Sequence, residues 1–156
     1  MQNKINSLRL RMKDNNVDLI VLGPGTHMRW LLGFNPYPDE RPCMLLIGKE
    51  KEAFLMPSVN AEDARKRTDI AINSWKDENG PDQALKEALI DIGESAAKHI
   101  AIDEAMRSHF ALILIEALPN PSYEFTGSTI GALRMRKDQT EFINLKENAL
   151  IDDRAM

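Results

Sequence analysis

Three short apolar runs near the start of the chain constrain its fold more than any other feature. They are "VDLIVLG" at residues 17–23, "CMLLIG" at 43–48 and "EAFLMP" at 52–57. Short runs of this kind, closed by glycine, proline or charged residues, are typical of buried β-strands. The charged "KEKE" between the second and third runs suits a tight connection, so this pair predicts an antiparallel hairpin.

Helical patterns flank these strands. Ile5, Leu8 and Met12 recur at helical spacing before the first run, and Thr26 is a good N-cap for a short helix that ends near Gly33. A further helix is expected to begin at Pro81 and to end at Gly93. Its apolar stripe consists of Leu85, Ala88, Leu89 and Ile92.

The second half of the chain continues the alternation of helices and strands. Strands are expected in "DIAINSW" (69–75), "HIAID" (99–103) and "YEFTGS" (123–128), a short exposed helix in "VNAEDARKR", and a well-buried helix in "MRSHFALILIEAL", which ends at Pro119. An Asp138-x-x-Glu141 capping box opens a last helix that places Phe142, Leu145 and Ala149 on one face. The pattern predicts a three-layer α/β/α domain with a mixed sheet of five to six strands.

Composition excludes several classes of protein. With 156 residues, 43% of them hydrophobic, the chain suits one domain. It has no apolar run that could cross a membrane and no signal peptide, so we expect a cytoplasmic protein. A net charge of -4 with both signs interspersed argues against nucleic-acid and membrane partners. The single cysteine, Cys43, lies in an apolar run and is expected to be structural.

No catalytic motif is evident. His27, His99 and His109 are far apart and lack metal-binding spacings, and the last two are expected to be structural. "GPGTHMRWLLG" lacks the third glycine of a phosphate-binding turn, and Pro24 removes a donor. Adjacent carboxylates are frequent, but their spacing distinguishes none of them. The sequence therefore predicts neither a catalytic group nor a metal site in this chain.

Arg41 is the candidate binding residue. It lies in a loop stiffened by Pro36, Pro38 and Pro42, which lowers the entropy cost of holding its guanidinium in place. A guanidinium can bind a carboxylate through two parallel hydrogen bonds. The residues alone favour the simpler alternative of a surface ion pair with the neighbouring Asp39 or Glu40.

The order of these segments resembles a known family. A helix, "VDLIVLGPGTHMRWLLGF", a loop containing "ER" and "MLLIGKEKEAFLMP" are similar to the N-terminal domain of the creatinase, prolidase and aminopeptidase P family. "SWKDENGPDQALKEAL" and "IGALRMRKDQTEFINLKENALIDDRAM" resemble later parts of that domain. The resemblance implies a ribonuclease H-like fold over residues 1–133, followed at 134–156 by a linker and the start of a helix leading into a catalytic domain that this chain lacks.

The resemblance also implies where the chemistry lies. Enzymes of this family hold two metal ions, commonly manganese, cobalt or zinc, in the catalytic domain, where a bridging hydroxide is the nucleophile. We therefore expect no cofactor and no catalytic residue in this chain. The parent protein is expected to hydrolyse peptide bonds before proline in dipeptides or short peptides.

The N-terminal domain of dimeric family members packs against the partner subunit and lends a loop to the rim of its active site. The matching loop here is "FNPYPDERP", in which Arg41 would contact the substrate carboxylate. Phe34 and Tyr37 would be apolar neighbours of a prolyl ring, within a homodimer. Trp30 and Leu32 replace the tyrosine and the threonine or serine common in the family. A creatinase-like C–N hydrolase parent and a stand-alone interaction module without catalysis remain alternatives.

Overall fold

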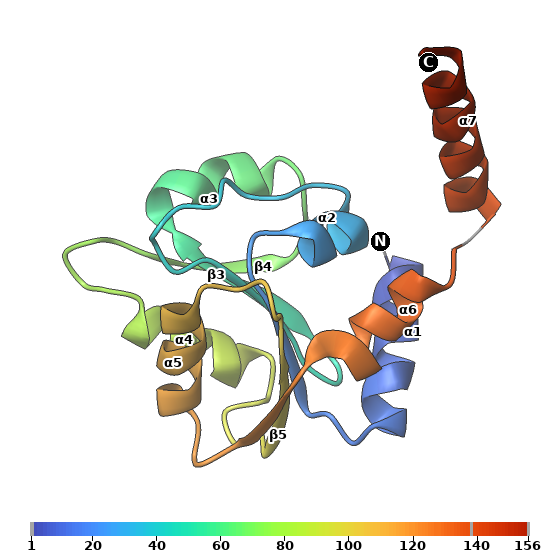
Figure 1. The fold of residues 1–156 in the computed structure, drawn as a ribbon. Helices are drawn as coiled ribbons and strands as arrows, with labels where there is room; N and C mark the ends of the chain where they lie inside the picture. The colour runs from blue at the N-terminus through green and yellow to red at the C-terminus, as the bar shows by residue number, and fades with distance from the viewer. Residues whose placement is uncertain (1, 138, 156) are drawn as a thin grey trace.

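The computed structural model describes residues 2–137 and 139–155 as a mixed sheet between two layers of helices (Figure 1). The elements are α1 (Gln2–Asp14), β1 (Leu19–Leu22), α2 (Thr26–Leu32), β2 (Met44–Ile47), β3 (Glu52–Pro57), α3 (Ser58–Arg65), β4 (Ala71–Trp75), α4 (Asp82–Asp91), β5 (His99–Ile102), α5 (Ser108–Ala117), β6 (Ser122–Phe125), the 3-10 helix η1 (Thr126–Ser128), α6 (Ile130–Met135) and α7 (Gln139–Ala155).

The sheet has six strands in the order β4-β3-β2-β1-β5-β6. Strand β2 is antiparallel to both β1 and β3, as the hairpin prediction requires, whereas the other pairings are parallel. Five strands therefore run in one direction and β2 runs in the other. The predicted three-layer α/β fold with a mixed sheet is confirmed.

Alternating side chains on the central strands fill two separate cores. Ile20 and Leu22 of β1 face the layer formed by α1, α2, α3 and α6, whereas Leu19 and Val21 face α4 and α5. Because the side chains of a strand alternate between its two faces, a continuous apolar run can serve both cores. This explains why the strands of the sheet centre read as unbroken apolar runs.

Two glycines end helices where the sequence predicted. Gly33 after α2 has φ +82° and Gly93 after α4 has φ +81°, both in the left-handed region. The N–H of Gly33 donates to the carbonyl of Arg29 at 2.8 Å, which satisfies one of the last carbonyls of α2. Glycine suits both positions because it adopts this conformation without a Cβ clash.

Two helix predictions and one strand prediction need correction. Thr26 is the first helical residue of α2, and the N-cap is Gly25, which has no side chain to cap with. The apolar segment before Pro119 begins its helix only at Ser108 and is not well buried, because α5 has one covered face and leaves Leu112 57% exposed. The strand expected at 123–128 ends at Phe125, and its last three residues form η1. Neither η1 nor α6 was predicted, because Gly127 and Gly131 weaken their local helix signal.

The C-terminal helix α7 forms as predicted and stands apart from the layered body (Figure 1). The first residue of its expected capping box, Asp138, lies outside the described residues. Phe142 and Leu145 are exposed. Near its start, Glu141 accepts a hydrogen bond from the indole N–H of Trp30 at 2.6 Å. Of the described helices, none is long and apolar enough to span a bilayer.

Candidate functional site

The candidate loop crosses the edge of the sheet at which β1, β3, β4, β5 and β6 end and β2 begins. We call this edge the carboxyl edge and residues 34–43, which connect α2 to β2, the proline loop. In sheets of mostly parallel strands, ligands bind preferentially outside the carboxyl ends of the strands. The fold thus presents the proline loop where binding residues are most often found.

Hydrogen bonds within the proline loop and to other parts of the fold anchor it. Gly25 N–H donates to Asn35 Oδ1 at 2.7 Å, Arg41 N–H to Asp39 Oδ1 at 2.9 Å, Trp75 Nε1–H to the Pro42 carbonyl at 2.9 Å, and His109 Nε2 lies 3.0 Å from the Glu40 carbonyl. The last two bonds join the loop to β4 and α5. Together with the three prolines, these contacts limit the conformations available to the loop.

Arg41 is held by a carboxylate from the loop after β4. Its Nε–H and Nη2–H donate to Asp77 Oδ1 and Oδ2 at 3.1 and 3.2 Å. Asp39 Oδ2 and Glu40 Oε1 lie 3.7 and 3.8 Å from Nη1, at ion-pair distances. The ion pairs considered for Asp39 and Glu40 are therefore present, but Asp77 makes the hydrogen bonds.

The same contact favours the charged forms of this pair. The hydrogen bond and charge of Asp77 raise the pKa of Arg41, and the hydrogen bond from Arg41 lowers the pKa of Asp77. Both groups are charged at neutral pH, and both are exposed to solvent. The pair therefore orients the guanidinium more than it stabilises the fold.

Phe34 and Tyr37 lie in a different depression. They line a groove of about 390 Å³ between the proline loop and α3, which we call the α3 groove. Phe34 packs against the first core, with its ring centroid 6.3 Å from that of Phe54, whereas Tyr37 is 78% exposed. Arg41 lines a neighbouring depression with Trp75 and Asp77, and Val59 borders both. The structure thus brings Phe34 and Tyr37 together but places Arg41 beside them.

A buried histidine occupies another part of the carboxyl edge. His27 of α2 is 6% exposed; its Nδ1 accepts from Arg134 Nη1–H at 2.7 Å, and its Nε2 lies 3.2 Å from Glu104 Oε1. Thr126 donates to Glu104 Oε2 at 2.6 Å. Burial alone would raise the pKa of Glu104, but the hydrogen bonds from Thr126 and His27 lower it. This cluster joins α2, η1, α6 and the end of β5.

The His27 cluster does not suit a divalent metal ion. Ligand atoms of His27, Asp103 and Glu104 lie within 4.8 Å of one another. Arginine can only donate, so Nδ1 of His27 must accept from Arg134, and the proton of the neutral ring resides on Nε2. The lone pair that a metal would need is therefore absent from the nitrogen that faces the carboxylates. The hydrogen bonds indicate a structural cluster.

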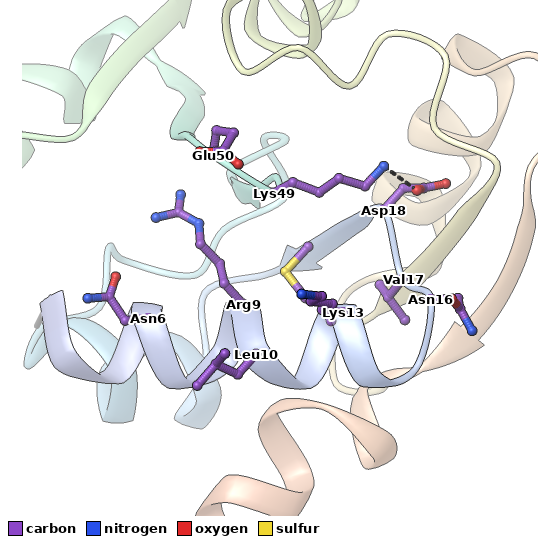
Figure 2. Close-up of a pocket in the computed structure, with 10 residues that line it drawn as sticks. Asn6, Arg9, Leu10, Lys13, Asn16, Val17, Asp18, Lys49 and Glu50 are labelled. Carbon is purple, nitrogen blue, oxygen red and sulfur yellow. Dashed lines mark ion pairs between the residues drawn. The ribbon is translucent and has the colours of Figure 1, made fainter.

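A further groove lies at the opposite end of the sheet (Figure 2). It has a volume of about 660 Å³ and lies between α1 and the turn of the hairpin. Figure 2 shows Lys49 from the turn paired with Asp18, and Arg9 of α1 pairs with Glu52. Arg9 and Lys49 of this groove are thus paired with neighbouring acidic residues. None of the predicted site residues lines the groove.

Comparison with known proteins identifies the domain. A sequence model described as the Creatinase/Prolidase N-terminal domain matches residues 4–136, which is most of the chain. The chain belongs to this family. Among curated proteins, none is similar enough to the chain to count as a match.

Solved structures share the fold of this creatinase/prolidase N-terminal domain. A prolidase from Thermococcus sibiricus matches with a TM-score of 0.82 and 20% identity over 98% of this chain, and a dipeptidase from Pyrococcus horikoshii OT3 with 0.77 and 23% over 88%. The N-terminal domain of an X-Pro dipeptidase from Streptococcus pyogenes matches with 0.72 and 17% over 80%. The match covers 42%, 38% and 94% of those chains, respectively. At these identities the likeness shows the fold alone.

Several residues of this creatinase/prolidase N-terminal domain were missed by the sequence reasoning. Asp77 and the cluster around His27 join segments far apart in the chain, and no local pattern marks such contacts. The helix α6 runs through the predicted boundary at residue 133, and Arg134 bonds His27 on the other side of it. The family match ends at residue 136. The division at 133 and the assignment of Arg41, Phe34 and Tyr37 to a site stay predictions.

Proposed function

We propose that this chain is the non-catalytic N-terminal domain of a cytoplasmic Xaa-Pro dipeptidase or aminopeptidase. In this proposal the parent protein is a homodimer that hydrolyses the peptide bond before proline, and the domain supports dimerisation and limits access to the active site of the partner subunit. The supporting observation is one of length. The chain spans 38% and 42% of the Pyrococcus dipeptidase and the Thermococcus prolidase, but the match covers 94% of the isolated Streptococcus domain.

In this proposal, the catalytic chemistry of the parent protein takes place in a part of that protein outside this chain. Two divalent metal ions, of manganese, cobalt or zinc, would supply the metal-bound hydroxide that attacks the peptide bond. Such a centre requires several carboxylate and imidazole ligands with free lone pairs. Among the described residues, one group of three histidine and acidic side chains lies close enough together to hold a metal ion, and its histidine, His27, is occupied by its own hydrogen bonds. The domain is therefore proposed to act on access and substrate position, and not on the bond itself.

The proline loop is the element proposed to meet the substrate. Asp77 holds the Nε and Nη2 edge of Arg41. Asp39 and Glu40 lie at ion-pair distances from Nη1 but make no hydrogen bond to it, so the edge formed by Nη1 and Nη2 is proposed to receive a carboxylate at the rim of the active site. Tyr37, 78% exposed, would add an apolar contact at the same rim. Phe34 would support the loop from beneath, since it packs against Phe54.

An activity assay tests whether the chemistry lies outside this chain. The purified chain is incubated with Ala-Pro and Mn²⁺, and proline release is measured beside the full-length parent protein at equal molarity. We expect release by the parent and none by residues 1–156 alone. Proline release by the purified chain would contradict the proposal if it disappears when residues of the chain itself are substituted, because the chemistry would then lie in this domain.

A further inference from the structure

The His27 ring joins α2 to α6 through a hydrogen bond that only the neutral ring can make. Its Nδ1 lies 2.7 Å from Nη1 of Arg134, and a guanidinium has donors but no acceptor, so Nδ1 must accept. A protonated imidazole carries a hydrogen on both nitrogens and has no lone pair left for this bond. The two side chains can therefore stay bonded only while His27 is uncharged.

Protonation of His27 would also bring two cations into contact. The His27 ring is 6% exposed, so solvent screens its charge only weakly, and an imidazolium beside a guanidinium is repelled by it. Arg134 can move away because it is only half-buried. Its Nη1 also donates to the exposed hydroxyl of Thr26 at 3.2 Å, which is a neutral and solvated acceptor. Uptake of a proton by His27 should therefore displace the Arg134 side chain.

Carboxylates on the other side of the ring favour its charged form. Glu104 Oε1 lies 3.2 Å from Nε2, and Asp103, from the same segment after β5, belongs to the same cluster. Burial raises the pKa of Asp103, so this carboxyl gains a proton at a higher pH than an exposed aspartate does. From η1, Thr126 lies 3.4 Å from Nε2 and carries no charge. The ring thus lies between a cation that requires it neutral and acids that favour its protonation.

We propose that the bond between His27 and Arg134 is a pH-dependent switch, formed while His27 is neutral and broken when its ring takes up a proton. In the broken state Glu104 retains the charged ring, and the last turn of α6 gains freedom of movement. Ile130, 0% exposed, keeps the start of α6 in the core. The switch therefore acts on the segment that leads from α6 to α7. It lies within one chain, so its test is independent of the proposed function of the parent protein.

The test follows the isotope-labelled chain by NMR from about pH 7.5 to 5, the range in which histidine changes its charge. We expect the neutral His27 ring to carry its proton on Nε2. As the ring titrates, the side-chain Nε–H of Arg134 should become more mobile in ¹⁵N relaxation measurements, with the same midpoint as the ring signals. His99, a more exposed imidazole bonded to Ser122, titrates in the same samples, and its midpoint should not govern Arg134.

Two variants separate His27 from its acidic neighbours. His27→Asn places a carbonyl oxygen where Nδ1 stands, and this acceptor does not titrate, so the mobility of Arg134 should be the same at both ends of the pH range. Asp103→Asn removes the buried carboxyl but keeps an oxygen that can accept from the Ala105 N–H. In this variant the Arg134 response should persist and should follow the titration of His27.

Four results would overturn the proposal. They are a neutral ring protonated on Nδ1, a ring that stays neutral down to about pH 5, unchanged Arg134 mobility while His27 titrates, and an undiminished response in His27→Asn. Loss of the response in Asp103→Asn while His27 still titrates would assign the switch to Asp103 and contradict the proposal as well. The first three results come from the wild-type chain, so they stand even if a variant fails to fold.

Discussion

Asp77 binds one edge of the Arg41 guanidinium through two parallel hydrogen bonds of 3.1 and 3.2 Å. The two residues come from the loops before β2 and after β4, which lie on either side of β3 at the carboxyl edge. Because a guanidinium is planar, hydrogen bonds to its Nε and Nη2 define its plane and therefore the direction in which Nη1 points. The arrangement orients the Arg41 guanidinium without burying it.

Substitution of Asp77 should free Arg41 without unfolding the domain. In Asp77→Asn the amide offers one acceptor in place of two, so the side-chain Nε–H of Arg41 should become more mobile in ¹⁵N relaxation measurements. The unfolding midpoint in urea should barely change, because the pair is exposed to solvent. If the ¹⁵N relaxation of Arg41 Nε is the same in Asp77→Asn as in the wild type, Asp77 does not orient the guanidinium.

Asp18 should make the stability of the domain depend on pH. Burial alone would raise its pKa, but hydrogen bonds from Lys49 and from the backbone N–H groups of Lys98 and His99 lower it below the usual value. A group with a lowered pKa in the folded state stabilises the fold above its unfolded pKa, and that contribution is lost as the pH falls through the folded pKa.

Asp18→Asn should therefore lower the free energy of unfolding by about 1 kcal/mol at pH 7, and the difference should shrink below roughly pH 4. Urea denaturation across this range measures it. Asp69→Asn, at an exposed position, is the matched control and should change little. A difference between wild type and Asp18→Asn that grows toward low pH would contradict the assignment.

His27 should be a structural residue of the carboxyl edge. Its replacement by alanine leaves the groups of Arg134 and Glu104 that it pairs with partly unsatisfied. We expect His27→Ala to lower the free energy of unfolding by about 2–3 kcal/mol in urea titrations. His99→Ala, which removes a more exposed imidazole bonded to Ser122, should cost less. Equal costs for the two variants would argue against a special role of the His27 cluster.

Cys43 should be unreactive in the folded protein. It is 1% exposed, and burial, with a smaller effect of Asp39, raises the pKa of its thiol to about 12. Thiolate is the reactive form, so almost none is present at pH 8. Labelling by a thiol reagent such as DTNB should be slow in buffer and fast in urea. Fast labelling of the native protein would place Cys43 at the surface.

The features that the sequence predicted are those encoded locally. The hairpin follows from two apolar runs and a charged link, and the ends of α2 and α4 follow from Gly33 and Gly93, since each signal lies within a few residues. The solvent exposure of side chains along α5 could not be predicted from local sequence in this way. Leu112 belongs to a uniformly apolar segment, and only the position of α5 on the sheet leaves it in solvent.

The site was only partly predictable for the same reason. Arg41 and the proline loop were identified from local chemistry and from the family resemblance. The partner Asp77 depends on the strand order, which places β4 two positions from β2. The bond between His27 and Arg134 joins residues 107 positions apart. Such contacts depend on the topology of the fold, so short sequence patterns do not predict them.

The kinetics of Arg41→Ala in the full-length parent protein test the central proposal most directly. If the proline loop binds the substrate carboxylate, kcat/KM for Ala-Pro should fall roughly tenfold or more, while kcat/KM for Ala-Pro-amide, which lacks that charge, should change little. Asp77→Asn should show the same selectivity with a smaller loss. Equal effects of Arg41→Ala on both substrates, or none on either, would contradict a role of this loop at the active site.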